Sequence, residues 1–215
     1  MHDQAVTDFR SSPKNFLPQI LRPPVDLRST LIMAEPKNPW TTKETREVYK
    51  NPWIRVTESD VLNPSGNPGI YGVVHFVHTA VGAVPLAEDG TTWLVGQYRY
   101  TLDKYSWEIP EGGGKPDEDP LECAKRELLE ETGITAANWE PLLTGTQPSN
   151  SVSDEVGFVY IARDLTIGEA EPEDCEDLQL KRLPLCEAID MAMRNEIQDA
   201  LSVAALLKMR CLGLG

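Results

Sequence analysis

One stretch, residues 111–134, constrains the fold of this 215-residue chain more than any other. Asp119 can cap a helix with its side chain, Pro120 suits a first helical turn, and Gly133 can end the helix in a left-handed conformation. These signals predict a helix over residues 120–131. A glycine-rich segment precedes it, and glycines let the backbone approach a ligand closely.

The predicted helix has an apolar back and an acidic front. At about 100° per residue, one face carries Leu121, Ala124 and Leu128, and we expect this face to pack on a sheet. The opposite face carries three carboxylates: Glu127, Glu130 and Glu131.

Three carboxylates at this spacing repel one another, at a cost of about 0.2–0.5 kcal/mol for each like-charged pair. Arg126 is placed to pair with Glu122 and Glu130, but one guanidinium does not neutralise the whole front. Mg²⁺ prefers oxygen ligands and accepts several carboxylates, so the front suits a divalent cation. The alternative is a solvated acidic face, which is the usual meaning of a run of charges.

The segment before the helix, Glu-Gly-Gly-Gly at residues 111–114, follows a predicted strand at 106–109 and is expected to be a loop. Together with the helix it fits the pattern G-x5-E-x7-R-E-U-x-E-E-x-G-U without a gap, where U is a large aliphatic residue. Seven fixed letters at average residue usage make a chance fit in this chain rarer than about one in a million. The segment therefore resembles the box of the Nudix family, and the matching residues are Gly112, Glu118, Arg126, Glu127, Leu128, Glu130, Glu131, Gly133 and Ile134.

The resemblance implies an α/β fold: the Nudix α/β/α sandwich with a mixed β-sheet, carrying here an N-terminal antiparallel strand extension. It also implies that Glu127, Glu130 and Glu131 bind Mg²⁺, or Mn²⁺ in its place, and that the Glu111 carbonyl oxygen joins them. The implied reaction is attack of a metal-activated water on a diphosphate phosphorus. Supporting roles for the loop and the helix fall to Gly112, Glu118, Arg126 and Gly133.

The segments that flank the box resemble one branch of the Nudix family. Residues 93–100, WLVGQYRY, followed by 106–114, SWEIPEGGG, resemble the branch of ADP-ribose pyrophosphatases and nucleoside-diphosphate-sugar hydrolases. Arg99 matches the position where that branch places an arginine on the substrate phosphates, and a guanidinium fork suits phosphate oxygens. The alternative for Arg99 is an exposed arginine at a strand end.

Two aromatic residues, Trp53 and Tyr71, stand on predicted strands where similar ADP-ribose enzymes place aromatics that stack on the base, often across a homodimer. Core packing explains either residue equally well. Gly72 and Phe76 replace the acidic and basic contacts expected nearby, and residues 147–155 depart from the expected loop pattern. These departures favour a broader range of nucleotide sugars than ADP-ribose alone.

The general base is expected on a loop past the box, where related hydrolases carry a glutamate that activates the water. Residues 172–177 form an acidic loop in this region, and we predict Glu176 as the base, with Glu173 and Asp174 as alternatives. A solvated acidic loop is the other interpretation. Glu155 and the aspartate before it are weaker candidates, because their segment leads directly into a strand.

The chain divides into three predicted regions. Residues 1–39 are rich in Pro, Ser and Asp and are interpreted as a flexible tail, with Met33 as an alternative translation start. Residues 40–75 form a β extension, which we expect to contribute to the dimer interface and to binding of the substrate base. Residues 76–212 form the Nudix hydrolase domain.

Residue patterns predict the remaining elements. Short β-branched and aromatic runs between turn residues indicate antiparallel strands across residues 41–100. Further strands are predicted around 140–143 and 156–161, and helices at 185–194 and 199–209. The predicted core face of the last helix comprises Ala200, Val203, Ala204 and Leu207.

The chain is acidic, with 34 Asp and Glu against 20 Lys and Arg and a net charge of −14. It contains no visible cluster of basic residues, so we expect no nucleic-acid partner. The same acidity repels an anionic substrate, which again favours a divalent cation at the site.

Four cysteines, Cys123, Cys175, Cys186 and Cys211, lack the spacing of zinc ligands and predict reduced thiols in a cytoplasmic protein. No window approaches the roughly 18 apolar residues that a membrane span requires. The first residues also lack the apolar region of a secretory leader. We therefore expect neither membrane insertion nor secretion.

Together these features predict Mg²⁺-dependent hydrolysis of the pyrophosphate bond of nucleoside diphosphate sugars, of the ADP-ribose, ADP-glucose or GDP-mannose type. The products would be a nucleoside monophosphate and a sugar phosphate. One alternative is a nucleoside triphosphate pyrophosphohydrolase. Another is a nucleotide-sugar sensor without catalysis, although degenerate domains of that kind lose box carboxylates that this chain retains. The resemblance also implies a homodimer.

Overall fold

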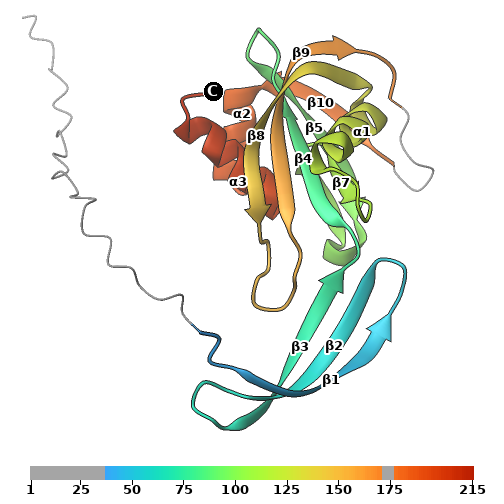
Figure 1. Cartoon of the computed structure of the whole chain (residues 1–215). Helices are drawn as coiled ribbons and strands as arrows, with labels where there is room; N and C mark the ends of the chain where they lie inside the picture. Colours follow the sequence, from blue (N-terminus) through green and yellow to red (C-terminus); the bar gives the residue numbers. More distant parts are fainter. Residues whose placement is uncertain (1–36, 171–176) are drawn as a thin grey trace, which may run out of the picture. The chain divides into compact units, whose positions relative to one another are not determined.

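The computed structural model describes residues 37–170 and 177–215 (Figure 1). The chain separates into two units, residues 1–38 and residues 39–215, and all the elements below belong to the second. The predicted tail lies outside the described residues except for residues 37–39.

An antiparallel sheet of three strands begins the second unit, in the order β1 (Thr41–Lys50), β2 (Ile54–Leu62) and β3 (Pro68–Phe76). Residues 63–67 form a tight turn between β2 and β3, in which the Asn63 side chain accepts hydrogen bonds from the backbone N–H groups of Ser65 and Asn67. The predicted β extension is therefore present as a separate sheet.

A mixed sheet of four strands forms the centre of the unit. Its order is β7 (Glu111–Gly114), β4 (Thr79–Pro85), β9 (Gly157–Ile167) and β8 (Ile134–Thr146). Strands β4 and β9 run parallel, and the other neighbours are antiparallel. A third sheet of three antiparallel strands has the order β10 (Gln179–Pro184), β5 (Thr91–Arg99) and β6 (Lys104–Glu108).

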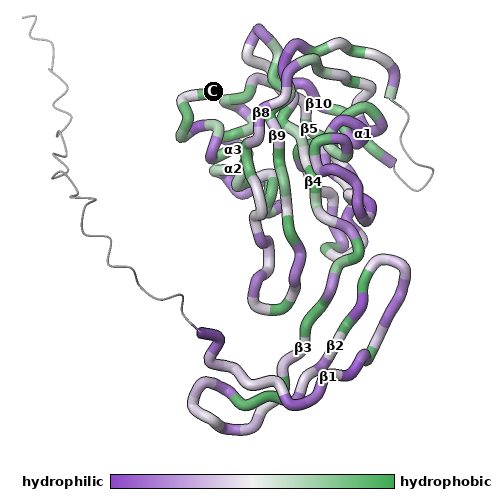
Figure 2. Tube along the Cα trace, in the orientation of Figure 1, coloured by the Kyte–Doolittle hydropathy of each residue, from purple (hydrophilic) through white to green (hydrophobic). Residues whose placement is uncertain are grey.

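Helices cover both faces of the mixed sheet: α1 (Pro120–Thr132) on one side, and α2 (Leu185–Met193) with α3 (Ala200–Cys211) on the other (Figure 1). Because side chains alternate along a strand, β4 supplies both layers. Val81 and Ala83 pack with residues of α1, whereas Val84 packs in the cluster that contains α2 and α3. Figure 2 shows hydrophobic stretches along β4 and β9, between the two helical layers. This arrangement confirms the α/β/α prediction.

Some predicted elements differ from the structure. The glycine segment 111–114, predicted as a loop, pairs with β4 as the short strand β7, since glycines lower strand propensity without preventing pairing. Strand β10 was not predicted, because its sequence mixes apolar, polar and charged residues and most of them are exposed. Trp53 lies in the connection between β1 and β2 rather than on a strand.

The prediction for α3 chose the wrong residues as the buried face of the helix. Ala200 is exposed, and the buried face comprises Leu201, Ser202, Ala205, Leu206 and Met209. The buried Ser202 hydroxyl has a hydrogen-bond partner, because it accepts a 3.0 Å hydrogen bond from the backbone N–H of Ile109. Among the described helices, none is both long and apolar enough to span a membrane.

Candidate active site

Helix α1 begins and ends where the sequence predicts. The Asp119 side chain accepts hydrogen bonds from the backbone N–H groups of Leu121 (2.9 Å) and Glu122 (3.3 Å). Gly133 adopts a φ of 69°, and its N–H donates to the carbonyl of Leu129. The helix therefore holds its side chains in a defined register against the loop that precedes it.

Arg126 organises the acidic front of α1. Its Nη1 donates to Glu127 at 2.7 Å and to Glu130 at 2.9 Å. The predicted pair with Glu130 is thus present, but the predicted pair with Glu122 is wrong. Glu122 accepts from Lys125 instead, because the guanidinium of Arg126 turns toward the preceding loop.

The other edge of the Arg126 guanidinium binds that loop. Its Nε and Nη2 donate to the two carboxylate oxygens of Glu118 at 3.1 and 3.0 Å, and Nη2 also donates to the Gly113 carbonyl. Hydrogen bonds from Arg126 and from the Lys115 backbone lower the pKa of Glu118 to about 2. Arg126 and Glu118 therefore tie the loop to the helix.

The carboxylates closest to the loop are withdrawn from solvent. Glu131 is 5% exposed, and its Oε2 accepts a 2.9 Å hydrogen bond from the backbone N–H of Glu111. A Cβ added at Gly112 would lie 2.2 Å from the carboxyl carbon of Glu127. The alternative of a solvated acidic face is therefore wrong for these residues, which lie against the backbone of the loop.

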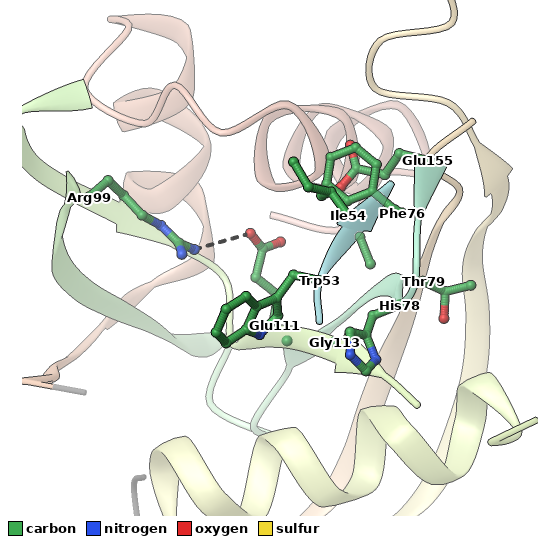
Figure 3. Close-up of a pocket in the computed structure, with 11 residues that line it drawn as sticks. Trp53, Ile54, Phe76, His78, Thr79, Arg99, Glu111, Gly113 and Glu155 are labelled. Atoms are coloured by element: carbon green, nitrogen blue, oxygen red, sulfur yellow. Dashed lines mark ion pairs between the residues drawn. The ribbon is translucent and has the colours of Figure 1, made fainter. Parts of the chain in front are cut away.

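A cavity of about 420 Å³ opens beside this loop. It brings together residues from β2, β3, β4, β5, β7 and the connections around them (Figure 3). The residues that matter for chemistry or stacking are Trp53, Phe76, His78, Arg99, Glu111 and Glu155. Of the two predicted base-stacking residues, only Trp53 lines this cavity.

Tyr71 lies elsewhere on the first sheet. Its hydroxyl donates to the Ser151 carbonyl at 2.9 Å, and its ring makes an edge contact with Trp40 at 5.3 Å between centroids. The structure therefore does not bring Tyr71 together with Trp53 at the cavity.

Arg99, at the end of β5, extends into the cavity (Figure 3). Its Nε donates to both carboxylate oxygens of Glu108, at 2.9 and 3.0 Å, and its Nη2 lies 3.8 Å from Glu111 Oε1. The hydrogen bonds to Glu108 raise the pKa of Arg99, which keeps the guanidinium charged. The predicted phosphate-binding arginine is thus held in place by a buried carboxylate.

Glu108 was missed by the sequence analysis. It is 4% exposed on β6, where Ser106 is also buried. The signal available in the sequence was an acidic residue at an inward position of an alternating strand, which requires a cationic partner.

Two further carboxylates in the cavity are only partly solvated. Burial raises the pKa of Glu111 well above its usual value, and the negative charges of Asp199 and Glu108 raise it further. Burial, followed by the charge of Asp199, also raises the pKa of Glu155. Glu155, the weaker candidate for the base, thus lines the cavity and has a raised pKa.

The favoured base, Glu176, lies outside the described residues, as do its alternatives Glu173 and Asp174. The segment that precedes Glu155 joins β3 to the catalytic part of the chain. Asp154 accepts from the ring of His75 at 2.6 Å and from the backbone N–H of Phe76 at 3.0 Å.

A second cavity of about 490 Å³ adjoins the first and shares Phe76, Arg99 and Glu155 with it. Ser106, Glu108, Gln198 and Asp199 add polar side chains to its lining. Arg99 therefore borders two adjoining spaces, of which the first is lined by Trp53 and the second by Ser106 and Gln198.

The donor set fits a divalent cation, although the described residues contain no preassembled group of three or more metal-ligating side chains. Arg126 forms ion pairs with two of the box carboxylates, Glu127 and Glu130. Two observations support the fit: Gly112 leaves space only for the Glu127 carboxylate, and Glu111 Oε2 is buried without a hydrogen bond from any described residue. Carboxylate and carbonyl oxygens are the ligands that Mg²⁺ and Mn²⁺ prefer.

Comparison with known protein families gives two adjacent matches. The NUDIX domain matches residues 77–205, and the nucleoside diphosphate sugar hydrolase N-terminal domain matches residues 40–74.

Individual proteins are also similar. An ADP-ribose pyrophosphatase of Mycobacterium tuberculosis is 33% identical over 150 residues, covering 66% of this chain and 69% of that protein. A CMP-5'-(N-acetyl-N-hydroxy-3-aminopropyl)phosphonate hydrolase of Streptomyces rubellomurinus is 31% identical over 181 residues, covering 82% and 84% of the two chains. A crystal structure of an ADP compounds hydrolase superposes with a TM-score of 0.73 and 24% identity, over 83% of this chain and 96% of that one, so the fold is shared.

The NUDIX match covers more than half of the chain and contains the glycine segment, the acidic helix and three of the strands that border the cavity, β4, β5 and β7. The resemblance drawn from the box is confirmed: the chain belongs to the Nudix family and is a Nudix hydrolase.

Proposed function

We propose that this Nudix hydrolase cleaves the pyrophosphate bond of nucleoside diphosphate sugars of the ADP-ribose, ADP-glucose or GDP-mannose type, in a Mg²⁺-dependent reaction. The observation that carries the proposal is the grouping of Arg99, Trp53 and the Glu111 segment around one cavity. Such a substrate requires a cationic side chain that binds its phosphates, an aromatic ring that stacks on its base and carboxylates that bind the metal. The names of the similar proteins, ADP-ribose pyrophosphatase and ADP compounds hydrolase, point the same way.

Glu127, Glu130, Glu131 and the Glu111 carbonyl oxygen would hold the cation. When bound, Mg²⁺ supplies an activated water and offsets charge on the phosphoryl oxygens. Arg126 contacts Glu127 and Glu130 through Nη1 alone. Its Nε and Nη2 remain on Glu118 when those contacts are released, so the loop stays attached to the helix.

Arg99 would bind the diphosphate, since it borders both cavities. Trp53, 65% exposed at the first cavity, offers a face to the base. In the second cavity, the polar side chains of Ser106 and Gln198 suit the hydroxyl groups of the sugar. The bond to be cleaved would then lie between the two spaces, beside the box helix.

Water activation is assigned to Glu176, with Glu155 as the competing candidate. Glu176 belongs to the acidic segment after the box, whereas Glu155 has the support of its place in the cavity. A glutamate with a raised pKa in a cleft is suited to proton transfer near neutral pH.

A homodimer is proposed through the first sheet. Strand β1 is exposed along its whole length, and the sheet exposes large apolar side chains: Val48, Tyr49, Ile70 and Tyr71. Contiguous exposed apolar side chains mark interaction surfaces, and a second copy of the chain would cover these. We place the β extension at residues 40–75 and the hydrolase domain at 76–212.

A cytoplasmic location is also proposed. The described cysteines, Cys123, Cys186 and Cys211, are free thiols. Unpaired thiols of this kind suit a reducing compartment.

The test is a panel of ADP-ribose, ADP-glucose and GDP-mannose with Mg²⁺, in which a phosphatase releases phosphate from the products but not from intact substrate. Chromatography should identify a nucleoside monophosphate and a sugar phosphate. Pyrophosphate released from free nucleoside triphosphates would favour the triphosphate alternative instead. Tight binding without product after long incubation would favour a sensor.

The Glu131→Gln variant provides the residue control for this panel. It should keep the wild-type fold by circular dichroism and lose at least about 100-fold in kcat, because even outer-shell partners of metal ligands contribute 10–100-fold. Glu140→Gln, an exposed substitution on β8, should keep wild-type activity. Near-normal turnover by Glu131→Gln would overturn the ligand assignment.

A further inference from the structure

Glu111 carries a side chain that the family resemblance does not use, since the resemblance assigns only its carbonyl oxygen. It lies on β7 opposite Gly82 of β4. Its neighbour Gly112 faces the Glu127 carboxylate, whereas the Glu111 side chain enters the cavity toward Arg99 (Figure 3). The chain therefore adds a carboxylate to the site at the position before the box glycine.

This carboxylate is poorly satisfied by the protein. Its side chain is 14% exposed, and Oε2 is buried without a hydrogen bond from any described residue. Oε1 lies 3.8 Å from Arg99 Nη2, which is too long for a hydrogen bond. Arg99 is bound to Glu108 by Nε and Nη2, so it does not compensate Glu111 fully.

The surrounding charges make the deficit larger. Asp199, Glu108 and Glu131 all act on Glu111 with negative charge, against the single positive charge of Arg99. A buried carboxylate oxygen that accepts no hydrogen bond is costly, and native proteins retain few of them. A structural role alone would be served better by a neutral side chain of similar size.

Glu111 also adjoins the proposed ligands of the cation. The backbone N–H of Glu111 donates to Glu131 Oε2 at 2.9 Å, so one residue contacts the ligand cluster through its backbone and presents a second carboxylate beside it. A divalent cation is the partner that matches an unsatisfied oxygen in an all-oxygen, negatively charged site.

We propose that the Glu111 side chain is itself a ligand of the divalent cation, in addition to the backbone carbonyl. The proposal rests on the metal dependence proposed above. It makes Glu111 a determinant of cation affinity, and it predicts that a neutral residue at this position weakens cation binding without weakening the fold.

The experiment compares the full-length wild-type chain with Glu111→Gln and Glu108→Gln. Binding of Mn²⁺ is measured by electron paramagnetic resonance of the free ion, and the Tm is measured in chelator and in Mg²⁺. Glu111→Gln should weaken Mn²⁺ binding about tenfold or more and reduce the rise in Tm that Mg²⁺ produces. In chelator it should melt at or above the wild-type temperature, because the amide removes a charge that has no hydrogen-bond partner.

Glu108→Gln is the matched control, since it changes a buried glutamate three residues away that is fully paired with Arg99. It should lower the Tm in chelator by about 2 °C or more. If the wild-type chain binds Mn²⁺ and Glu111→Gln binds the same number of ions with the same affinity, this inference is overturned and the proposed metal dependence stands. A wild-type chain that binds no Mn²⁺ overturns the proposed metal dependence, and this inference with it.

Discussion

Gly112 is a box residue at which an added side chain would clash with a box carboxylate. Its φ is not the reason, since Gly112 is absent from the residues with positive φ. The reason is space, because a Cβ there would meet all three terminal atoms of the Glu127 carboxyl group at 2.2–2.5 Å. The glycine therefore lets the loop backbone and the carboxylate lie in contact.

Gly112→Ala should consequently displace the Glu127 carboxylate and lower kcat by about tenfold or more, with cation affinity reduced in parallel. Gly69→Ala is the matched control, because a Cβ at Gly69 meets nothing within 4 Å. Both variants are compared by steady-state kinetics and Mn²⁺ titration. Equal activity of the two variants would contradict the close approach.

Single substitutions distinguish Glu176 from Glu155 as the general base. If Glu176 is the base, Glu176→Gln should lower kcat by about 100-fold or more, the usual contribution of a general base, while Glu155→Gln changes kcat much less. The measurement is kcat at saturating substrate and Mg²⁺ across a pH range. The reverse order of effects would transfer the role to Glu155.

At the scale of elements, the position of α1 depends on its ends. The Asp119 cap satisfies two backbone N–H groups at the start of the helix, immediately after the loop that contains Glu118. A helix that frays at this end would loosen Arg126 and the carboxylates it organises.

Asp119→Ala should lower the free energy of unfolding by about 1 kcal/mol, the typical value of an N-cap, measured by urea denaturation. Asp119→Asn should retain most of the stability, because asparagine caps equally well. A loss of similar size in both variants would show that the negative charge, rather than the hydrogen bonds, stabilises this end.

Elements were predictable to the extent that their signals are local. The caps of α1 depend on contacts within four residues, and both ends were predicted to within one residue. The face of α3 was misjudged because alanines and leucines lie on most of its sides, so which side is buried depends on the strands it meets. The pairing of β7 with β4 joins residues about thirty positions apart, which glycine-rich sequence does not reveal.

At the scale of the whole molecule, the first sheet is attached to the catalytic part by few described contacts. These are made by the segment before β9, in which Val152 and Asp154 pair with the backbone of Val74 and with His75. The proposed dimer would add further support to the same sheet.

Wild-type protein should therefore have a solution mass of twice the 23.9 kDa chain mass by light scattering. Ile70→Glu, which places a charge on the first sheet, should shift the mass toward that of one chain. Ile167→Glu, at the end of β9, is the control: the two isoleucines are 66% and 62% exposed. A wild-type mass of one chain, or dissociation by both variants, would contradict a dimer through this sheet.

The amino-acid sequence by itself determined the box helix, its caps, the three box carboxylates and the family, because these follow from spacing within about 25 consecutive residues. Only the tertiary structure decided the partners of those residues. The tertiary contacts between strands, loops and α1 place Glu108 on Arg99 and Glu155 in the cavity, and they also withdraw Glu131 from solvent and separate Tyr71 from Trp53. Side-chain spacing is a property of the local backbone, whereas burial and charge pairing depend on which segments the fold brings together.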